Sequence, residues 1–508
     1  MSEPFQEFLP MSCSLSRAAR LVAALALLLP GTLAAQAQPA PPPALSLPEA
    51  ISLARQNNPE FLSQANDVDA ARWGVRSAYG SLLPTASAAQ RFGYTAAGPL
   101  RLGPETFGER PEYYTSSYNI GLSYELSGTR ILQPSVARAQ ARATEQRVEG
   151  AEATLVAQVT QQYLTVLQAQ ENVAQAEREV ARTEAHVRLA QARLEVGAGT
   201  SLDVRRAEVQ RGQAEVSLVQ ARNQLATATL TLGRLAGTPL QPGVQLTSEF
   251  QLFEPQWESE QLLATALRNN PNLLASRAAA DAAQTRVNAS RTNYLPTLNF
   301  NVGWQGSVYQ AANVDPLIEN QLLQAQDRFG QCLESNTIRT AVGLSALNCR
   351  NPADPAVQEQ IRTRVRAENQ GFPFDYERQP LSAGVTISLP IFTGLNRQQQ
   401  IAEARVAAQD ARYQVRAEQL RVQAEVQTAL LNVQTAYRTA QLQAVVRATA
   451  AEELRLAEER FRFGAASSIE VTDAQTRLAE TERAEIDAVY NFHQSLAALE
   501  ALIGQPLR

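Results

Sequence analysis

The sequence contains no lysine and very little histidine, cysteine or aromatic residue. All 45 basic residues are arginine, histidine occurs only at His186 and His493, and cysteine occurs three times. So few imidazole and thiol groups exclude most histidine-based acid–base catalysis and any cluster of His and Cys around a metal ion. Aromatic residues are 6% of the chain, too few for the core of a thick globular protein. The formal net charge of −5 gives no reason to expect nucleic-acid binding.

The sequence is instead rich in Ala, Leu, Val, Gln, Glu and Arg. Hydrophobic residues are 44% of the 508 residues, and long stretches consist mainly of these six types. That composition is typical of long packed helices rather than of a compact α/β enzyme. We find no Gly-rich phosphate loop and no nucleophile elbow. The sequence therefore predicts a protein that is not an enzyme and uses no cofactor or metal.

The N-terminus, residues 1–37, is predicted to be a signal peptide for export. Two arginines precede an apolar run at 21–29, and the small residues Ala35 and Ala37 follow it, so cleavage is expected after Ala37. The first ten residues are acidic for a signal peptide, which makes Met11 an alternative start. The apolar run is too short to span a bilayer, and no cysteine follows closely enough to carry a lipid.

Matching residues divide the mature chain into two tandem copies. Asn57-Asn58-Pro59 recurs as Asn269-Asn270-Pro271, an offset of 212 residues. Gly197 recurs as Gly464, an offset of 267 residues, so the second copy carries an insertion of 55 residues. Such a repeat predicts that each copy forms one supersecondary unit of the fold. The predicted division is a Pro-rich linker at 38–45, a first repeat at 46–240, a linker at 241–256 and a second repeat at 257–508.

Each copy is predicted to consist of a helix, two strands and a long helical hairpin. A capping box at Ser46 starts the first helix, which runs to about Ser81 and bends at Pro59. The hairpins have unequal arms, and the short first helix has the length needed to extend the shorter arm end to end. The expected ranges are strand pairs at 85–127 and 297–391, a long outer loop at 310–380, and hairpins at 133–236 and 395–504.

The strands alternate between apolar and polar residues, which indicates one apolar and one polar face. Alternation is clear over 118–126, 298–304 and 381–389 and weakest over 85–94. Four strands cannot close a membrane barrel, whereas three chains would supply twelve. The alternative is an ordinary half-buried sheet covered by helices. The aromatic residues expected on the lipid-facing side are Phe92, Tyr94, Tyr118, Tyr124, Phe300, Trp304, Tyr309 and Phe392.

The hairpin turns carry a resemblance to a known family. The segments VGAGTSLDV (196–204) and FGAASSIEV (463–471) resemble the hairpin tips of the TolC family of outer-membrane efflux proteins. The resemblance covers about 45–508. It implies a homotrimer in the outer membrane, with a twelve-stranded barrel continued by an α-helical barrel in the periplasm. It also implies a passive duct for efflux or type I protein secretion, joined through a periplasmic adaptor to an inner-membrane pump.

The resemblance assigns roles to residues at the tips. Glu470 and Asp473 match an acidic selectivity ring at the entrance, although acids near a helix start also simply favour the helix dipole. Phe461 matches a tip aromatic that holds the entrance shut, and Asp203 lies beside it in the gate. Ala466 stands where the family has a latch arginine. The substitutes considered are Arg205, Arg206 and Arg462, and the expected adaptor-docking residues are Gly197, Leu202, Val204, Gly464, Ile469 and Val471.

The insertion in the second copy is expected to be an outer loop closed by a disulfide. Cys332 and Cys349 are the two cysteines left after export, an even number in an oxidising compartment. The alternative is two free thiols. For function, the alternative to an exit duct is a periplasmic coiled-coil adaptor or structural protein. A drug, a metal ion or a secreted protein all remain open as cargo, with the absence of a lipid-anchor cysteine favouring secretion slightly.

Overall fold

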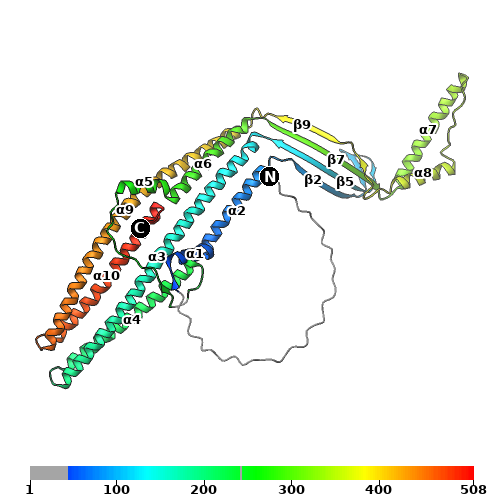
Figure 1. Ribbon diagram of the computed structural model, residues 1–508. Helices are drawn as coiled ribbons and strands as arrows, with labels where there is room; N and C mark the ends of the chain where they lie inside the picture. The colour runs from blue at the N-terminus through cyan, green and yellow to red at the C-terminus, as the bar shows by residue number, and fades with distance from the viewer. Residues whose placement is uncertain (1–43, 241–242, 508) are drawn as a thin grey trace, which may run out of the picture.

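The computed structural model describes residues 44–240 and 243–507, so the predicted signal peptide and its cleavage site lie outside the described residues. The molecule is elongated, with long helices at one end, a sheet beyond them and a helical arm at the far end (Figure 1). Two short strands, β1 (Ala44–Leu45) and β6 (Gln245–Leu246), pair in parallel beside the helices. No helix among the described residues is both long and apolar enough to cross a membrane.

Two long antiparallel hairpins form the helical part. The first joins α3 (Gly128–Glu195) to α4 (Ser201–Ala236), and the second joins α9 (Asn396–Arg462) to α10 (Ser468–Ile503). Both hairpins were predicted, but α3 begins at Gly128 rather than at 133. The Ser127 hydroxyl caps it by accepting a hydrogen bond from the Arg130 N–H at 3.3 Å, so Pro134 lies inside the helix.

Four shorter helices precede the strands, two in each half of the chain. They are α1 (Leu47–Asn57), α2 (Pro59–Gly80), α5 (Ser259–Asn269) and α6 (Pro271–Arg291), the last followed by the 3₁₀ turn η1 (Thr292–Tyr294). The predicted capping box at Ser46 is present. The single helix predicted to bend at Pro59 is instead two helices, separated by Asn58 in an extended conformation. A proline at the start of α2 costs little because the first N–H groups of a helix have no partner within it.

A buried asparagine joins α2 to the end of α4. The Asn58 Oδ1 accepts from the Phe61 N–H at 2.9 Å and so caps α2, while its Nδ2 donates to the Leu235 carbonyl at 2.9 Å near the end of α4. Gly237, at φ +70°, ends α4 so close to the Asn57 carbonyl that a Cβ would clash. We call this junction the helix splice. It places α2 end to end with α4, as predicted for the first helix, but α1 does not take part because it packs against the side of α3 and α4.

A second splice joins α6 to α10 with the same chemistry. The Asn270 Oδ1 accepts from the Leu273 N–H at 3.0 Å, and its Nδ2 donates to the Leu502 carbonyl at 2.9 Å. Gly504, at φ +78°, takes the place of Gly237. The recurrence of Asn-Asn-Pro in the sequence therefore marks a structural joint.

The sheet has four main antiparallel strands in the order β2-β5-β7-β9. The bounds are Thr85–Thr95 for β2, Tyr113–Leu126 for β5, Thr297–Ala311 for β7 and Ser382–Ser388 for β9. A short strand, β8 (Glu377–Arg378), pairs with the outer half of β7. Between β2 and β5 the chain forms a separate hairpin, β3 (Gly98–Leu102) and β4 (Glu105–Arg110).

The register gives the sheet one apolar and one polar face, as the alternation predicted. Ile120 lies opposite Trp304 on the apolar face, and the described helices leave this face open (Figure 1). Val385 and Ile387 on β9 are 62% and 73% exposed, so the alternative of a helix-covered sheet is wrong for the single chain. The placement of Tyr309 on the apolar face is also wrong. Its odd position puts it on the polar face, where its ring lies 4.8 Å from that of Tyr113.

The segment expected to be a long outer loop is largely helical, which corrects the prediction for 310–380. It contains α7 (Asp315–Ala341) and α8 (Pro355–Glu368) and lies at the opposite end of the molecule from the hairpin turns (Figure 1). A disulfide links Cys332 to Cys349, with 5.8 Å between the Cα atoms. At the base, Asn369 exchanges hydrogen bonds of 2.7 and 2.8 Å with the backbone of Ala311 and fixes the segment to β7.

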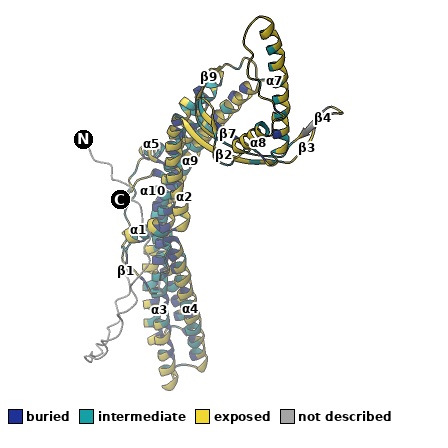
Figure 2. Ribbon diagram, turned by 90° about the vertical axis from the view of Figure 1, so that its right-hand side faces the viewer, coloured by how far each residue is buried: buried dark blue, intermediate teal, exposed yellow. Residues whose placement is uncertain are grey.

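Buried apolar residues form cores within each hairpin. The first packs Val159 and Tyr163 of α3 against Leu232 of α4, and the second packs Val426 of α9 against Phe492 of α10. Figure 2 shows the buried residues along the helical part and mainly exposed residues on α7. Each hairpin therefore holds itself together by burial of its own apolar side chains.

Candidate functional site

The candidate site is the pair of hairpin tips, where α3 turns into α4 and α9 turns into α10. Gly197 and Gly464 make the turns at φ +71° and +73°, a backbone conformation that favours glycine. In both tips an acid closes a capping box. Asp203 pairs with Thr200, and Glu470 pairs with Ser467. These contacts give both acids the helix-start role that was the alternative to an entrance ring.

Arg193 connects the two tips. From the end of α3, its guanidinium donates to the Phe461 carbonyl on α9 and, through Nη2, to the Ala198 carbonyl at 3.1 Å. The guanidinium also lies over the Phe461 ring, 4.3 Å from its centroid. Phe461 is buried, and Arg193 of the first hairpin holds this residue of the second hairpin through a cation–π contact and a hydrogen bond.

His186 packs on the other side of this contact. Its ring lies 5.9 Å from the Phe461 ring, and it is buried. Burial lowers the pKa of His186, and the negative charge of Asp203 opposes that effect. His186 is therefore neutral at neutral pH and packs against Phe461 as part of its apolar surroundings.

The arginines predicted as substitute latches do not make this contact within the single chain, and their role at a shared entrance stays a prediction. Arg205 pairs with Glu208 of its own helix at 2.8 Å, and Arg206 and Arg462 are exposed. The repeat in the sequence could have pointed to Arg193, because the second copy also has an arginine at the matching position. Arg460 stands at the same offset of 267 residues and donates to the Ala465 carbonyl at 3.1 Å, as Arg193 does to Ala198.

The acidic pair Glu470 and Asp473 is exposed at the start of α10, three residues apart on one helix face. Arg460 lies 3.4 Å from Glu470, a neighbour that the sequence analysis did not consider. The hydrogen bonds of Thr200, the side chain foremost, lower the pKa of Asp203 in the other tip. All three carboxylates are therefore accessible to ions near the tips.

The residues expected to dock an adaptor divide into two groups. Leu202 and Ile469 are exposed at the tips, at 55% and 47%. Val204 and Val471 are buried inside the hairpins, so their inclusion in a docking surface is wrong for this conformation. At Gly197 and Gly464 an added Cβ would meet no other atom within 4 Å.

Above the tips, a buried ion-pair cluster links α3 to α10. Arg182 donates to both oxygens of Glu482, at 2.8 and 2.5 Å, and lies 2.7 Å from Glu179 of its own helix. Gln175 adds a longer hydrogen bond of 3.4 Å to Glu482. Sequence reasoning missed this cluster because Arg182 and Glu482 are 300 residues apart.

The two carboxyl groups of the cluster respond differently to burial. Burial raises the pKa of Glu179, against the opposing effect of Arg182. Burial also disfavours the charge of Glu482, but the hydrogen bonds and the charge of Arg182 outweigh it and lower the pKa. Glu482 is therefore the main ionised partner of Arg182 across the hairpin interface.

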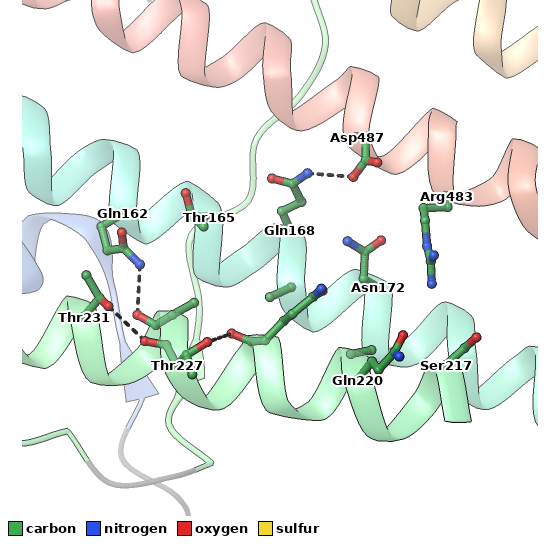
Figure 3. Close-up of a pocket in the computed structure, with 14 residues that line it drawn as sticks. Gln162, Thr165, Gln168, Asn172, Ser217, Gln220, Thr227, Thr231, Arg483 and Asp487 are labelled. Carbon is green, nitrogen blue, oxygen red and sulfur yellow. Dashed lines mark hydrogen bonds between the residues drawn. The ribbon is translucent and has the colours of Figure 1, made fainter. Parts of the chain in front are cut away.

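A polar groove of about 560 Å³ is lined by residues of α3, α4 and α10 (Figure 3). Gln168 of α3 donates to the Asp487 carboxylate of α10 at 2.7 Å at one side of it. A second hollow of about 380 Å³ shares Ser217, Arg483 and Asp487 with it and continues toward the tips. The two hairpins therefore touch through α3 and α10 while α4 and α10 stay largely apart.

Comparison with known proteins decides the family. A family model described as outer membrane efflux protein matches residues 50–238 and 358–505. The chain belongs to this family. Members of the outer membrane efflux protein family are channels rather than enzymes, and the protein is accordingly placed in the outer membrane. The alternative of a periplasmic adaptor receives no support from these matches. In the described part of the chain, no group of three or more His, Cys, Asp or Glu is placed to hold a metal ion.

Individual relatives agree with the family assignment. The chain is 25% identical over 261 residues to outer membrane protein TolC of Vibrio cholerae, which is 51% of this chain and 58% of the relative. It is also 25% identical over 259 residues to cobalt-zinc-cadmium resistance protein CzcC of Cupriavidus metallidurans, with the same two coverages. The chain thus spans somewhat over half the length of these relatives. A solved structure of CusC has the same fold, with a TM-score of 0.67 at 17% identity over 90% of this chain and 92% of that one.

Proposed function

We propose that the protein is the outer-membrane exit duct of a tripartite efflux pump or a type I secretion system. In this proposal it works as a homotrimer in the outer-membrane lipid. A periplasmic adaptor and an inner-membrane pump dock at the hairpin tips and open them. The duct itself is passive and carries no catalytic group.

The sheet supports a trimer because each chain leaves two strand edges unused. Among the described strands, β2 and β9 stand at opposite ends of the sheet, each with only one neighbour. Unpaired backbone groups cannot face lipid, so the two edges must pair with other copies. Three copies of a four-stranded sheet would close a twelve-stranded barrel.

The helices support the same assembly through exposed apolar stripes. Leu202, Val209 and Val216 follow one another every seven residues along α4, and Val406, Tyr413 and Leu420 do so along α9. A seven-residue apolar repeat is the pattern of a helix that packs against another helix. Both stripes are exposed in the single chain, the α4 stripe near the tips and the α9 stripe near the sheet. We infer that each packs against a helix of a neighbouring copy at its own level along the long axis.

The gate is proposed from a contrast between the apolar cores within the hairpins and the polar contacts between the hairpins. Each core is apolar, whereas α3 and α10 are joined by hydrogen bonds of Gln168, Gln175 and Arg182. The apolar contacts between the hairpins include Leu189 against the α9–α10 core and Tyr490 against the α3–α4 core. Water can replace polar contacts at little cost, while an apolar core must stay closed. The hairpins are therefore suited to separate as whole units, with the Arg193–Phe461 contact as the link to break.

Single-channel recording in planar bilayers tests this gate. Arg193→Gln removes the cation–π contact and a charge-assisted hydrogen bond worth about 1.5–3 kcal/mol. We expect the open probability to rise roughly tenfold or more, since 1.4 kcal/mol is a factor of ten. Arg188→Gln is the matched control and should behave as the wild type, because the exposed Arg188 pairs with Glu184 of its own helix. Equal open probabilities in all three proteins would remove the Arg193 gate from the proposal.

A further inference from the structure

The segment between β7 and β8, residues 312–371, forms an arm that the proposed transport path does not use. We call it the outer arm. It contains α7 and α8 and is fixed to β7 through Asn369. Figures 1 and 2 both show α7 running along the general direction of the long helices, on the far side of the sheet from the tips. In the proposed orientation the outer arm therefore points straight out from the cell.

The far end of the outer arm is held in a defined shape. The disulfide between Cys332 and Cys349 closes it, and we call residues 332–349 the outer knob. Asn336 binds the backbone of Leu347 through two hydrogen bonds, with its Nδ2 donating at 2.8 Å and its Oδ1 accepting at 2.6 Å. The Arg339 Nε donates to the Ser345 carbonyl at 3.0 Å. The return chain is thus tied to α7 at several points.

The outer knob is rich in exposed apolar side chains. Ile338 and Val342 are 62% and 66% exposed, and Leu333, Leu344 and Leu347 are each about half exposed. A group of this kind at an ordered tip marks a contact surface rather than a random surface composition. The bilayer cannot supply the contact, since α7 with 27 residues carries the outer knob roughly 40 Å beyond the sheet.

The dimensions of the assembly indicate what covers these residues. Twelve strands spaced about 4.8 Å apart and tilted by about 40° form a barrel roughly 24 Å across, so the bases of three arms lie roughly 20 Å apart. A helix with its side chains is about 10–12 Å thick, and a second element beside it brings an arm to roughly 20 Å. Three arms parallel to the barrel axis thus fill the space above its mouth and touch.

We infer that the three outer knobs of a trimer pack against one another and form a cover over the outer mouth. This inference rests on the proposed function, because it needs three copies around one barrel. Among its apolar residues the outer knob carries one acid, Glu334, and one base, Arg339, so the copies meet without strong repulsion between like charges. Cargo then leaves between the arms rather than straight along the axis.

Photo-crosslinking on whole cells and on the purified protein tests the inference. A photoreactive side chain at Leu344 should produce crosslinked dimers and trimers of this chain. Ile338→Asp with Val342→Asp places charges in the contact and should abolish those products. The control, Gln360→Asp with Thr363→Asp, adds the same charge to exposed positions of α8 and should retain them. Because Ile338 and Val342 are exposed, the outer arm should stay folded in this variant. An intact Cys332–Cys349 disulfide leaves no free thiol, so the unreduced variant should not react with a thiol reagent.

The outcomes separate this inference from the proposed function. Native mass spectrometry of the same purified samples shows whether the protein is a trimer. A trimer without crosslinks between copies overturns the outer cover and leaves the exit duct standing. Crosslinks at Leu344 to another protein or to lipopolysaccharide also overturn it. A protein that is not a trimer overturns both proposals.

Discussion

At the scale of single residues, one asparagine performs two tasks in each helix splice. Asn270 caps α6 with its carbonyl oxygen and satisfies the last turn of α10 with its amide group, and it is 2% exposed. A single helix of full length would need no such joint. The splice lets the chain leave the helical part for the strands and return, while the helix wall stays continuous.

Replacing Asn270 should destabilise the helical part. Asn270→Ala removes an N-cap worth about 1 kcal/mol and leaves the Leu502 carbonyl buried without its partner, which costs about 1–3 kcal/mol more. Thermal unfolding followed by circular dichroism should show a clearly lower midpoint. Asn269→Ala, at the exposed neighbouring position, should leave the midpoint unchanged. A similar loss in both variants would mean that the splice has no special role.

The acidic pair at the tips should set ion preference. Glu470→Gln with Asp473→Asn removes six charges from a trimer entrance while keeping side-chain size, so cation selectivity and block by multivalent cations should fall. Reversal potentials in a salt gradient across planar bilayers measure the change. Glu60→Gln with Asp69→Asn, two exposed acids of α2 far from the tips, should preserve selectivity. Unchanged selectivity in the tip variant would place the selective ring elsewhere.

At the scale of elements, the two hairpins are separate apolar bodies held together by a small polar contact. Arg182 is the centre of that contact, since it serves Glu482 of α10 and Glu179 of α3 together. The pKa shifts show that the arrangement favours charge on Glu482 and disfavours it on Glu179. Neutralising the two acids should therefore have different effects.

Glu482→Gln should weaken the hairpin contact, by about 3 kcal/mol, because it leaves Arg182 without its main partner. Glu179→Gln should have little effect or stabilise the protein at neutral pH. The lowered pKa of Glu482 means that its stabilisation is full above its ordinary value near 4.5 and is lost as pH falls through the lowered value. The raised pKa of Glu179 has the opposite sign, since its contribution is lost as pH rises through the raised value.

Unfolding midpoints of the wild type and both variants over a pH series measure these effects. The Glu482 variant should lose the fall in stability that the wild type shows at acid pH. Stronger destabilisation by Glu179→Gln than by Glu482→Gln at neutral pH would reverse the assignment of the two acids.

The regular elements were predictable because they obey local rules. Alternation indicated the strands, and the recurrence of Gly197 as Gly464 marked the two hairpin turns. The helices α7 and α8 were missed because the insertion was recognised only as excess length, although Asp315-Pro316 and Asp354-Pro355 are typical helix starts. Arg182–Glu482 and Arg193–Phe461 join residues far apart in the chain, and no local pattern indicates which pairs meet.

At the scale of the whole molecule, the chain is incomplete on its own in two places. The sheet has two open edges and an apolar face that the described helices leave uncovered, with residues 372–376 packed on its outer part. The helices carry exposed apolar stripes. Both features run along the length of the molecule, so one rotation about the long axis must satisfy them together. Three copies related in this way place the tips around one entrance and the outer arms around one exit.

The mass of the detergent-extracted mature protein tests this assembly most directly. Native mass spectrometry, or light scattering corrected for detergent, should give three chains per particle, because fewer chains leave strand edges and helix stripes open. The same preparation should form ion-conducting channels in planar bilayers. A monomer or a dimer that still conducts would contradict the account.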